Sequence, residues 1–315
     1  MSGRRMVVLG TASQAPTRHR NHNGYLLLLD DRAVLFDPGE GTQRQMLHAG
    51  VPASRLWCIC VTHFHGDHCL GLPGVIARLA LDQVDHPVEA YFPAAGSVFF
   101  ERLRGAAVSR PFDGLVPRPV AGTDGLVEVG RVGTWRLRAA RLDHGTATVG
   151  WRLDEPAGVR MLPDRLESAG VAGPAVAELM RDGRLRVGGR TVHLEEVSEA
   201  RPGQSVAFVM DTRPCEGAAL LAAGVDLLVC ESTFLSGEAG LAEEYGHMTA
   251  RQAAELAAGA GARRLLLTHF SQRHPDEAAF AAEAAPVFEA VTAAVDLMEV
   301  PLPPRRPPTG AGRGG

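Results

Sequence analysis

The 315-residue sequence contains no lysine. All 32 of its basic residues are arginines, and 36 acidic residues give a net charge of −4. This balance excludes a global positive field that would attract nucleic acid over the whole surface. A genome rich in G and C accounts for the uniform use of arginine. Because arginine makes bidentate contacts with phosphate, the composition still allows a local basic patch.

Long apolar runs are also missing. The best candidate, residues 25–29, is strand-sized, far below the ~18 residues of a membrane span. The N-terminus leads directly into the apolar residues 6–9, without the apolar stretch and cleavage pattern of a secretory signal. We therefore expect no membrane association and no secretion by that route.

Cysteine is scarce, with five residues and no CxxC pair. Cys58 and Cys60 lie inside an apolar run. The odd number and this spacing argue against a disulfide scaffold and against a cysteine-based zinc site. They favour a reducing, cytoplasmic location.

Short apolar runs alternate with helical patterns along most of the chain. The expected strands are 5–9, 25–29, 33–36, 57–62, 88–92, 135–140, 148–153, 205–210, 226–230, 264–268 and 294–300. The expected helices are 42–50, with Thr42 as its N-cap, 71–81, 216–223, 249–258 and 276–290. Mixed units of this kind predict an α/β fold in which helices cover sheets.

Two segments depart from this alternation. Residues 154–204 form a long insertion whose clearest element is a helical stretch at 175–180, and such insertions are usually functional or disordered. Residues 301–315 include nine prolines or glycines and are predicted to be a disordered tail. The rest of residues 1–300 is expected to be a single catalytic domain.

A histidine-rich loop follows the expected strand at 57–62. It reads His63-Phe64-His65-Gly66-Asp67-His68 and lies where α/β proteins place their sites, at the carboxyl end of a strand. Such a loop can give two ligands to one metal ion, His63 and His65, and two to a neighbouring ion, Asp67 and His68. Imidazole with carboxylate suits zinc first, with manganese or iron as alternatives.

Three later strands end in further ligand-type residues. Asp211 follows the strand at 205–210, His269 follows 264–268, and His144 follows 135–140. Each alone would be an ordinary turn, surface or core residue. Their joint placement at strand ends predicts that they complete a pair of metal sites with the histidine-rich loop.

The HxHxDH pattern of residues 63–68 is the signature of the metallo-β-lactamase superfamily. Within it, the chain resembles ribonuclease Z, the endonuclease family that trims tRNA precursors at the 3′ end. The resemblance covers about residues 6–300. It is carried by the motifs LFDPGEGTQ at 35–43, GP at 173–174, DTR at 211–213, ESTF at 231–234, GHMT at 246–249 and LTHFS at 267–271.

This resemblance implies a fold and a set of ligands. The fold is an αβ/βα sandwich, in which two mixed sheets pack face to face with helices outside. Two Zn²⁺ ions per subunit are implied. The first is bound by His63, His65 and His144, the second by Asp67, His68 and His269, and Asp211 bridges the two. A metal pair can lower the pKa of a bound water to about 7 and stabilise charge on an attacked phosphate.

The resemblance also implies two proton-transfer residues. Asp67 would accept a proton from the attacking water, and His247 would give one to the leaving 3′ oxygen, the two halves of general acid–base catalysis. Without the resemblance, His247 would be interpreted as an ordinary histidine beside the N-terminus of a helix, because Thr249 is a good N-cap. Glu231 ends another strand and is expected to orient a metal-bound histidine without binding metal itself.

Substrate contacts are expected at two places. The insertion matches the family's tRNA-binding arm, and its segment 181–190 carries a cluster of arginines that could neutralise phosphates. A solvated charged face remains the alternative, because residues 152–204 hold eight arginines against nine acidic residues. The clustered arginines are Arg181, Arg184, Arg186 and Arg190. Glu40 and Thr42 lie near a helix start and could cradle a phosphate or simply form a turn.

The expected function is thus a zinc-dependent endoribonuclease acting on precursor tRNA. It would leave a 3′-hydroxyl on the tRNA and a 5′-phosphate on the trailer. A homodimer is implied, because the family's arm serves the substrate of the neighbouring subunit. The alternatives are another phosphodiesterase of the same fold that acts on small phosphodiesters, and a tRNA-binding protein without catalysis.

Overall fold

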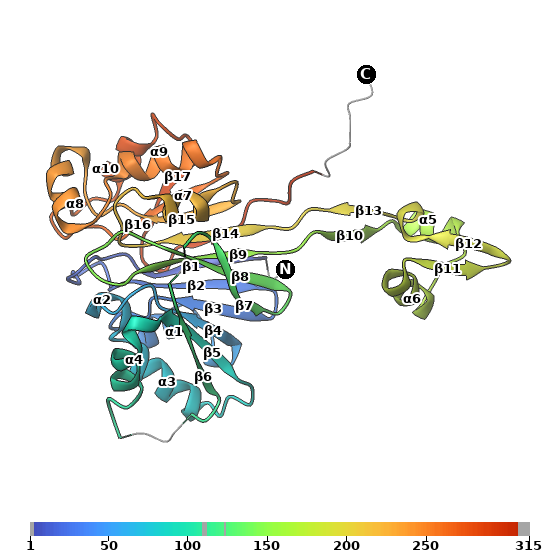
Figure 1. Cartoon of the computed structure of the whole chain (residues 1–315), viewed down its shortest axis with the longest axis horizontal. Coiled ribbons are helices and arrows are strands. Elements are labelled where there is room, and N and C mark those ends of the chain that lie inside the picture. Colours follow the sequence, from blue (N-terminus) through green and yellow to red (C-terminus); the bar gives the residue numbers. More distant parts are fainter. Residues whose placement is uncertain (1–2, 109–111, 123, 308–315) are drawn as a thin grey trace. The chain divides into compact units, whose positions relative to one another are not determined.

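The structure is a computed structural model that describes residues 3–108, 112–122 and 124–307 (Figure 1). The chain divides into two compact units. The first contains the residues up to 154 together with 205–303, and the second contains 155–204 together with the residues from 304 on.

The first unit contains a seven-stranded sheet with the order β18-β1-β2-β3-β4-β5-β6. Its strands are β1 (Arg5–Gly10), β2 (Gly24–Leu29), β3 (Arg32–Phe36), β4 (Leu56–Cys60), β5 (Val88–Pro93), β6 (Leu115–Val120) and β18 (Glu299–Pro301). Pairing is antiparallel from β18 to β3 and parallel from β3 to β6. The sheet is therefore mixed.

A second seven-stranded sheet has the order β17-β16-β15-β14-β9-β8-β7. Its strands are β7 (Val127–Val132), β8 (Trp135–Arg141), β9 (Val149–Asp154), β14 (Ser205–Val209), β15 (Leu227–Glu231), β16 (Leu265–Thr268) and β17 (Val291–Ala293). Strands β14 to β17 pair in parallel, whereas β7, β8 and β9 are antiparallel.

The two sheets pack face to face through one apolar cluster. Phe208 of β14 lies at its centre: its ring centroid is 5.0 Å from that of Tyr25 and 4.6 Å from that of Phe36, both on the first sheet. Each fully buried side chain of this size contributes roughly 1.5–3 kcal/mol of hydrophobic stabilisation. The sheet-to-sheet contact is the central core of the unit.

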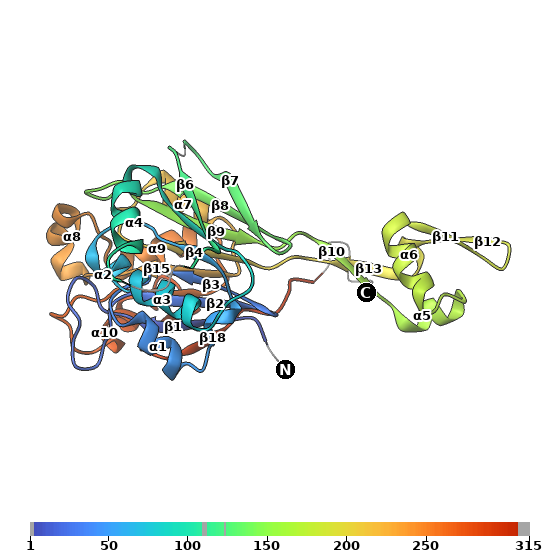
Figure 2. The same ribbon diagram turned by 90° about the horizontal axis from the view of Figure 1, so that it is seen from below.

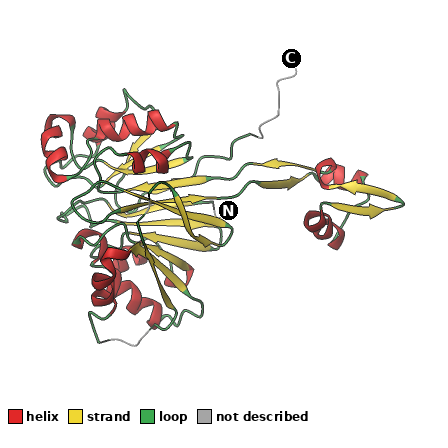
Figure 3. Cartoon of the chain, in the orientation of Figure 1, coloured by secondary structure: helices red, strands yellow, loops and turns green. Residues whose placement is uncertain are grey.

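Helices cover the outer faces of both sheets (Figure 3). The first sheet packs against α1 (Thr42–His48), α3 (Leu72–Leu81) and α4 (Ser97–Arg104), whose labels run from the bottom to the top of the unit in the view from below of Figure 2. The second sheet packs against α7 (Glu216–Ala222), α9 (Ala250–Ala260) and α10 (Ala278–Ala284). Two further helices, α2 (Gly66–Cys69) and α8 (Ala239–Tyr245), and the 3-10 turns Ala53–Arg55, Ala94–Gly96 and Ser236–Glu238 complete the described part of the unit. The predicted αβ/βα sandwich is confirmed.

The second unit has its own small core. It contains the antiparallel pair β10 (Gly158–Met161) and β13 (Ser198–Arg201), the hairpin β11 (Arg184–Val187) and β12 (Arg190–His193), helices α5 (Pro163–Ser168) and α6 (Pro174–Asp182), and the turn Leu194–Glu196. Val171, Leu179, Val192 and Val197 are buried together. The helical stretch expected at 175–180 lies within α6.

Two predictions near the C-terminus were wrong. The helix expected at 276–290 is α10 and ends at Ala284, because Pro286 has no backbone N–H to continue the hydrogen bonds of the helix. In place of the strand expected at 294–300, residues 294–298 contain a turn, and only residues 299 and 300 are extended, in β18. Leu297 in that turn has φ 65, which is not an extended conformation.

The tail predicted to be disordered from residue 301 begins with defined contacts. Pro301 closes β18, the next residue, Leu302, is buried, and Arg305 forms an ion pair with Glu155. Residues 308–315 lie outside the described residues. None of the described helices has the length and apolarity needed to span a bilayer.

Candidate metal centre

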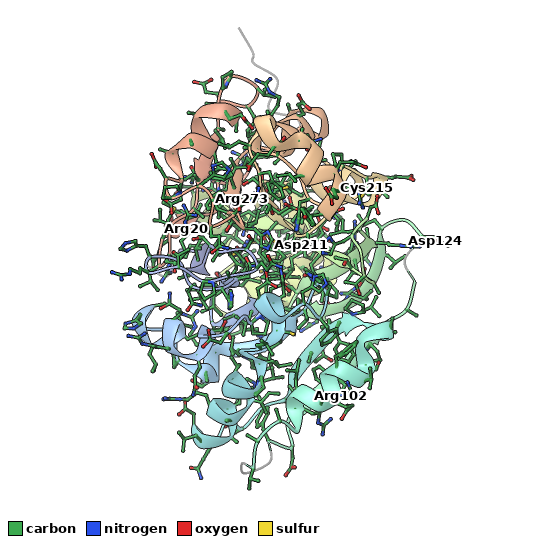
Figure 4. All side chains as sticks on the ribbon, turned by 90° about the vertical axis from the view of Figure 1, so that its left-hand side faces the viewer. Arg20, Arg102, Asp124, Asp211, Cys215 and Arg273 are labelled. Carbon is green, nitrogen blue, oxygen red and sulfur yellow. The ribbon has the colours of Figure 1, made fainter. Side chains whose placement is uncertain are left out.

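The seven side chains predicted to bind metal meet at one edge of the two sheets. They come from the ends of β4, β8, β14 and β16 and are His63, His65, Asp67, His68, His144, Asp211 and His269. Figure 4 shows Asp211 near the middle of the face that it draws, with Arg20 and Arg273 on one side and Cys215 on the other. Side chains that are far apart in the sequence therefore form a single polar cluster.

The backbone is unusual at three residues of this edge. Asp37, Asp211 and His269 have φ values of 44, 46 and 63, in the left-handed region that side-chain-bearing residues rarely adopt. Each such conformation costs of the order of 1–3 kcal/mol and persists where the surroundings impose it. Asp37 and His269 directly follow the last residues of β3 and β16, and Asp211 lies two residues after the end of β14.

Three imidazoles and one carboxylate form the first group. His65 Nδ1 lies 2.9 Å from His63 Nε2 and 3.3 Å from His144 Nε2. Asp211 Oδ2 lies 3.6 Å from His63 Nε2 and 3.8 Å from His144 Nε2. The four ligand atoms all lie within 4.8 Å of one another, so a single cation could contact all four.

Asp67, His68 and His269 form the second group. Asp67 Oδ2 lies 3.4 Å from His68 Nε2 and 3.5 Å from His269 Nε2. Asp211 adjoins this group too, with Oδ1 3.2 Å from His269 Nε2 and Oδ2 3.2 Å from His68 Nε2. Asp211 is thus the one carboxylate that lies between the two groups.

Two buried atoms of the cluster have no hydrogen-bond partner among the described residues. They are Asp211 Oδ1 and His269 Nε2, which lie 3.2 Å from each other without forming a hydrogen bond. A buried polar atom without a partner carries a desolvation cost of about 1–3 kcal/mol. Because a cation would be a partner for both atoms, the donor set fits a metal centre.

Asp37 orients part of the cluster from behind. It is fully buried and accepts hydrogen bonds from Thr62 N and Thr62 Oγ1, each at 2.7 Å. His68 Nδ1 also donates to it, at 2.8 Å. This bond turns His68 Nε2 toward the cluster, the usual way in which a carboxylate fixes a metal-binding imidazole. The sequence analysis did not identify Asp37, although it too follows a strand directly.

Hydrogen bonds also fix the orientation of the His144 and His269 imidazoles. His144 Nδ1 donates to the carbonyl of Gly246 at 2.9 Å. His269 Nδ1 donates to Thr233 Oγ1 at 2.7 Å, and that hydroxyl donates to Glu231 at 2.7 Å. Glu231, which was expected to orient a metal-bound histidine, therefore reaches His269 through Thr233, a residue that the sequence analysis did not identify.

Glu231 also contacts His247 directly. Its Oε1 lies 3.0 Å from His247 Nδ1 and accepts a hydrogen bond from Thr212 N at 2.7 Å. Burial alone would lower the pKa of His247, but the carboxylates of Glu231 and Asp211 outweigh burial and raise this pKa to about 9. With Nδ1 facing Glu231, Nε2 is the nitrogen that His247 can offer to a substrate.

Asp67 is held in its ionised form. Burial alone would raise the pKa of Asp67, but the neighbouring imidazoles of His68 and His269 hold it well below its usual value. A carboxylate in this state can coordinate a cation or accept a proton.

A cleft of about 650 Å³ gives access to the cluster. Its wall includes Asp67, His65, His144, Asp211, His247 and His269, together with Ser13, Gln14, Ala15, His22, Gly66, Leu70, Thr233, Phe234, Tyr245, Ser271, Gln272 and Arg273. The cleft combines candidate metal ligands, amides, an arginine and aromatic rings. Such a lining can hold a charged substrate that carries bases.

The residues expected to cradle a phosphate are arranged differently. Thr42 is fully buried, and its hydroxyl donates to Gly39 O at 2.7 Å, so it is not offered to a substrate. The N-cap of α1 is Gly41, not Thr42 as predicted. Glu40 is exposed and lies 3.9 Å from His22. The contacts of Thr42 are those of turn chemistry.

The four clustered arginines lie in the second unit. Arg181 forms an ion pair with Asp182, and Arg190 forms one with Glu196. Arg184 and Arg186 are exposed on β11 and form no ion pair within the described part of the chain. Because they are two residues apart on a strand, they share one face of the hairpin.

Comparisons with known proteins agree with the geometry. The family model described as "Metallo-beta-lactamase superfamily" matches residues 17–159, and one described as "Beta-lactamase superfamily domain" matches 194–270. A protein named Ribonuclease Z from Salinispora arenicola is 57% identical over 310 residues, covering 98% of this chain and 99% of its own. The Ribonuclease Z of Chlamydia caviae is 42% identical over 303 residues, covering 96% and 98%. Among solved structures, the short form of human tRNase Z superposes with a TM-score of 0.69 at 24% identity, covering 95% and 99%, which supports the fold.

Proposed function

This chain belongs to the ribonuclease Z family of the metallo-β-lactamase superfamily, and we propose that it is a metal-dependent endoribonuclease that removes the 3′ trailer from tRNA precursors. The resemblance found in its motifs is confirmed by relatives that match nearly its whole length. The observation that carries the proposal is the convergence of the ligand-type side chains around Asp211. The cut leaves a 3′-hydroxyl on the tRNA and a 5′-phosphate on the trailer.

The proposal includes two zinc ions per subunit. His63, His65 and His144 would hold the first, Asp67, His68 and His269 the second, and Asp211 both. The unpartnered buried atoms of Asp211 and His269 support this assignment, as does the mixture of imidazole and carboxylate, which suits zinc before manganese or iron. When bound, such a pair would acidify a water molecule and neutralise charge on the attacked phosphate.

Two residues of the chain would move the protons. Asp67 would accept the proton of the attacking water, for which its carboxylate must be ionised; the neighbouring imidazoles favour that state. His247 would donate a proton to the leaving 3′ oxygen, and its raised pKa keeps it protonated at neutral pH. The two side chains line the same cleft, so they can act on opposite sides of one phosphate.

The second unit would serve as the tRNA-binding arm of residues 154–204. Among the described residues, Arg184 and Arg186 form no ion pair, so their guanidinium groups are suited to phosphate, whereas Arg181 and Arg190 are already paired with carboxylates. We place the enzyme in the cytoplasm as a homodimer in which each arm serves the neighbouring subunit's substrate. The five cysteines are all free, which fits a reducing compartment.

The direct test is cleavage of a 3′-extended tRNA transcript by the purified protein, with and without a chelator. We expect one cut that leaves a 3′-hydroxyl on the tRNA, lost with chelator and restored by Zn²⁺. Asp67→Ala should abolish it. Cleavage of a small chromogenic phosphodiester without cleavage of the transcript would instead indicate a phosphodiesterase for small substrates. Binding of the transcript without any cut would indicate a tRNA-binding protein.

A further inference from the structure

Tyr245 is an exposed aromatic residue on the wall of the metal-site cleft. It is the last residue of α8, and 55% of it is exposed to solvent. Within the described residues, no other aromatic ring, hydrogen bond or ion pair engages its side chain. The other aromatic residue of this wall, Phe234, is only 6% exposed, with its ring centroid 6.0 Å from that of His247. Of the tyrosine and phenylalanine rings of this wall, Tyr245 is therefore the one exposed to a substrate.

The backbone beneath Tyr245 is held firmly. Gly246, with φ 78, is the C-cap of α8, and the next residue, His247, donates its backbone N–H to Ala242 O at 2.8 Å. Arg213 Nε donates to Glu243 O at 2.8 Å, and Arg213 NH2 lies within hydrogen-bond distance of Glu244 O, at 3.5 Å. These bonds tie the last turn of α8 to the loop that carries Asp211. The backbone that carries the Tyr245 ring is thus fixed in position, two residues before His247, the proposed proton donor.

The chemistry of the cut determines which nucleotide faces this wall. The leaving 3′ oxygen belongs to the last nucleotide of the tRNA, on the 5′ side of the cut. If His247 protonates that oxygen, the sugar of this nucleotide lies beside His247. Proteins commonly bind unpaired RNA bases by stacking them on exposed aromatic side chains.

We propose that Tyr245 is a stacking platform for the base of the last tRNA nucleotide. This assignment rests on the proposed function, because it needs a substrate whose 3′ oxygen leaves on the His247 side. Stacking involves the ring face and not the hydroxyl group. It gains more from a large purine than from a pyrimidine. Tyr245 would thereby make cleavage depend on the base next to the cut.

The test compares the parent enzyme with Tyr245→Ala and Tyr245→Phe on tRNA precursors that differ only at the last tRNA nucleotide. The set contains a purine, a pyrimidine and an abasic residue at that position. We expect Tyr245→Ala to lower kcat/KM for the purine precursor about 5- to 100-fold and for the pyrimidine precursor less. Tyr245→Phe should match the parent. On the abasic precursor, parent and Tyr245→Ala should be equal, because the partner base is gone.

Each other outcome has a defined meaning. An equal loss for Tyr245→Ala on purine and abasic precursors, or a similar loss on a small phosphodiester, would mean that Tyr245 supports His247 and would overturn the proposal. No loss on any precursor would overturn it as well. Failure of the proposed function is distinct, because the parent itself would then cut none of the precursors. If Tyr245→Ala does not fold, Tyr245→Leu removes the flat ring but keeps apolar bulk and should show the same base dependence. Leu81→Ala, at a 73% exposed residue ending α3, is the control for loss of an exposed apolar side chain.

Discussion

His144 and Gly246 are joined by a hydrogen bond from the imidazole Nδ1 to the glycine carbonyl, 2.9 Å long. A Cβ added to Gly246 would lie 2.9 Å from the same nitrogen, and the glycine holds φ 78. The next residue is His247. One glycine therefore connects a proposed metal ligand with the proposed proton donor.

Gly246→Ala should impair the candidate metal centre, although it removes none of the proposed ligand side chains. The added methyl group meets the His144 ring, and the left-handed conformation becomes costly by roughly 1–2 kcal/mol. Because misplacement of reacting groups by about 1 Å can cost about 100-fold, we expect a loss of that order in kcat. The measurement is transcript cleavage together with zinc content. Gly240→Ala, in α8, is the matched control, since no atom lies within 4 Å of the Cβ that this substitution adds. Equal activities of Gly246→Ala and Gly240→Ala would show that Gly246 does not position His144 and His247.

Asp37→Asn should weaken metal binding. Asparagine tolerates the φ of 44 found here, so the change mainly removes the charge that accepts the His68 Nδ1 proton. Loss of such a support typically lowers metal affinity about 10- to 100-fold, which competition with a chromogenic chelator measures. Asp30→Asn is the control, because Asp30 is an exposed aspartate with φ 50 away from the cluster. Unchanged affinity in Asp37→Asn would show that Asp37 does not orient His68.

Glu231→Gln should shift the pH dependence of cleavage. As an acid, His247 acts only when protonated, and its pKa of about 9 predicts that kcat falls as the pH rises above about 9. Since the Glu231 carboxylate helps to raise that pKa, its neutral amide should move the alkaline fall to lower pH. The pH profile of kcat, with zinc content as a check, measures this shift. Glu89→Gln, which removes the carboxylate beside Tyr91 on β5, should leave the profile in place. If the pH profile of Glu231→Gln equals that of the parent, the proton donor is not a His247 whose pKa depends on Glu231.

The sheets and the ligand cluster could be predicted because both follow from strand patterns. Apolar strands of the core give clear runs, and polar residues at their carboxyl ends meet at one edge of a sheet, as Asp211 and His269 do. The edge strands β6 and β7 were missed because their sequences do not read as strands. β6 contains two prolines, and β7 contains a glycine, residues that edge positions tolerate.

The supports of the cluster were harder to predict, because they depend on contacts between distant segments. Asp37 bonds to His68 and Thr233 to His269, and no local spacing relates the members of either pair. Thr42 shows the opposite problem. Its residue type and position suited a helix cap, but its buried hydroxyl bonds to Gly39 O, and Gly41 takes the cap position.

The second unit carries two pairs of arginines, on the hairpin β11–β12 and at the end of α6, that differ in their surroundings. Arg184 and Arg186 form no ion pair within the described residues, whereas Arg181 and Arg190 are paired with Asp182 and Glu196. If the arm binds tRNA phosphates, Arg184→Ala with Arg186→Ala should raise KM for the tRNA precursor and leave kcat nearly unchanged.

The salt dependence makes this prediction quantitative. Each lost phosphate contact should reduce the slope of log kcat/KM against log salt by about 0.7–0.9, or about 1.4–1.8 for both arginines. The matched control, Arg181→Ala with Arg190→Ala, should change the slope less, because carboxylates already neutralise those guanidinium groups. Hydrolysis of a small phosphodiester should be the same in all variants, since it needs only the metal centre. If both double variants changed KM and the slope equally little, this hairpin would be a solvated charged face, and the tRNA contacts would lie elsewhere on the chain.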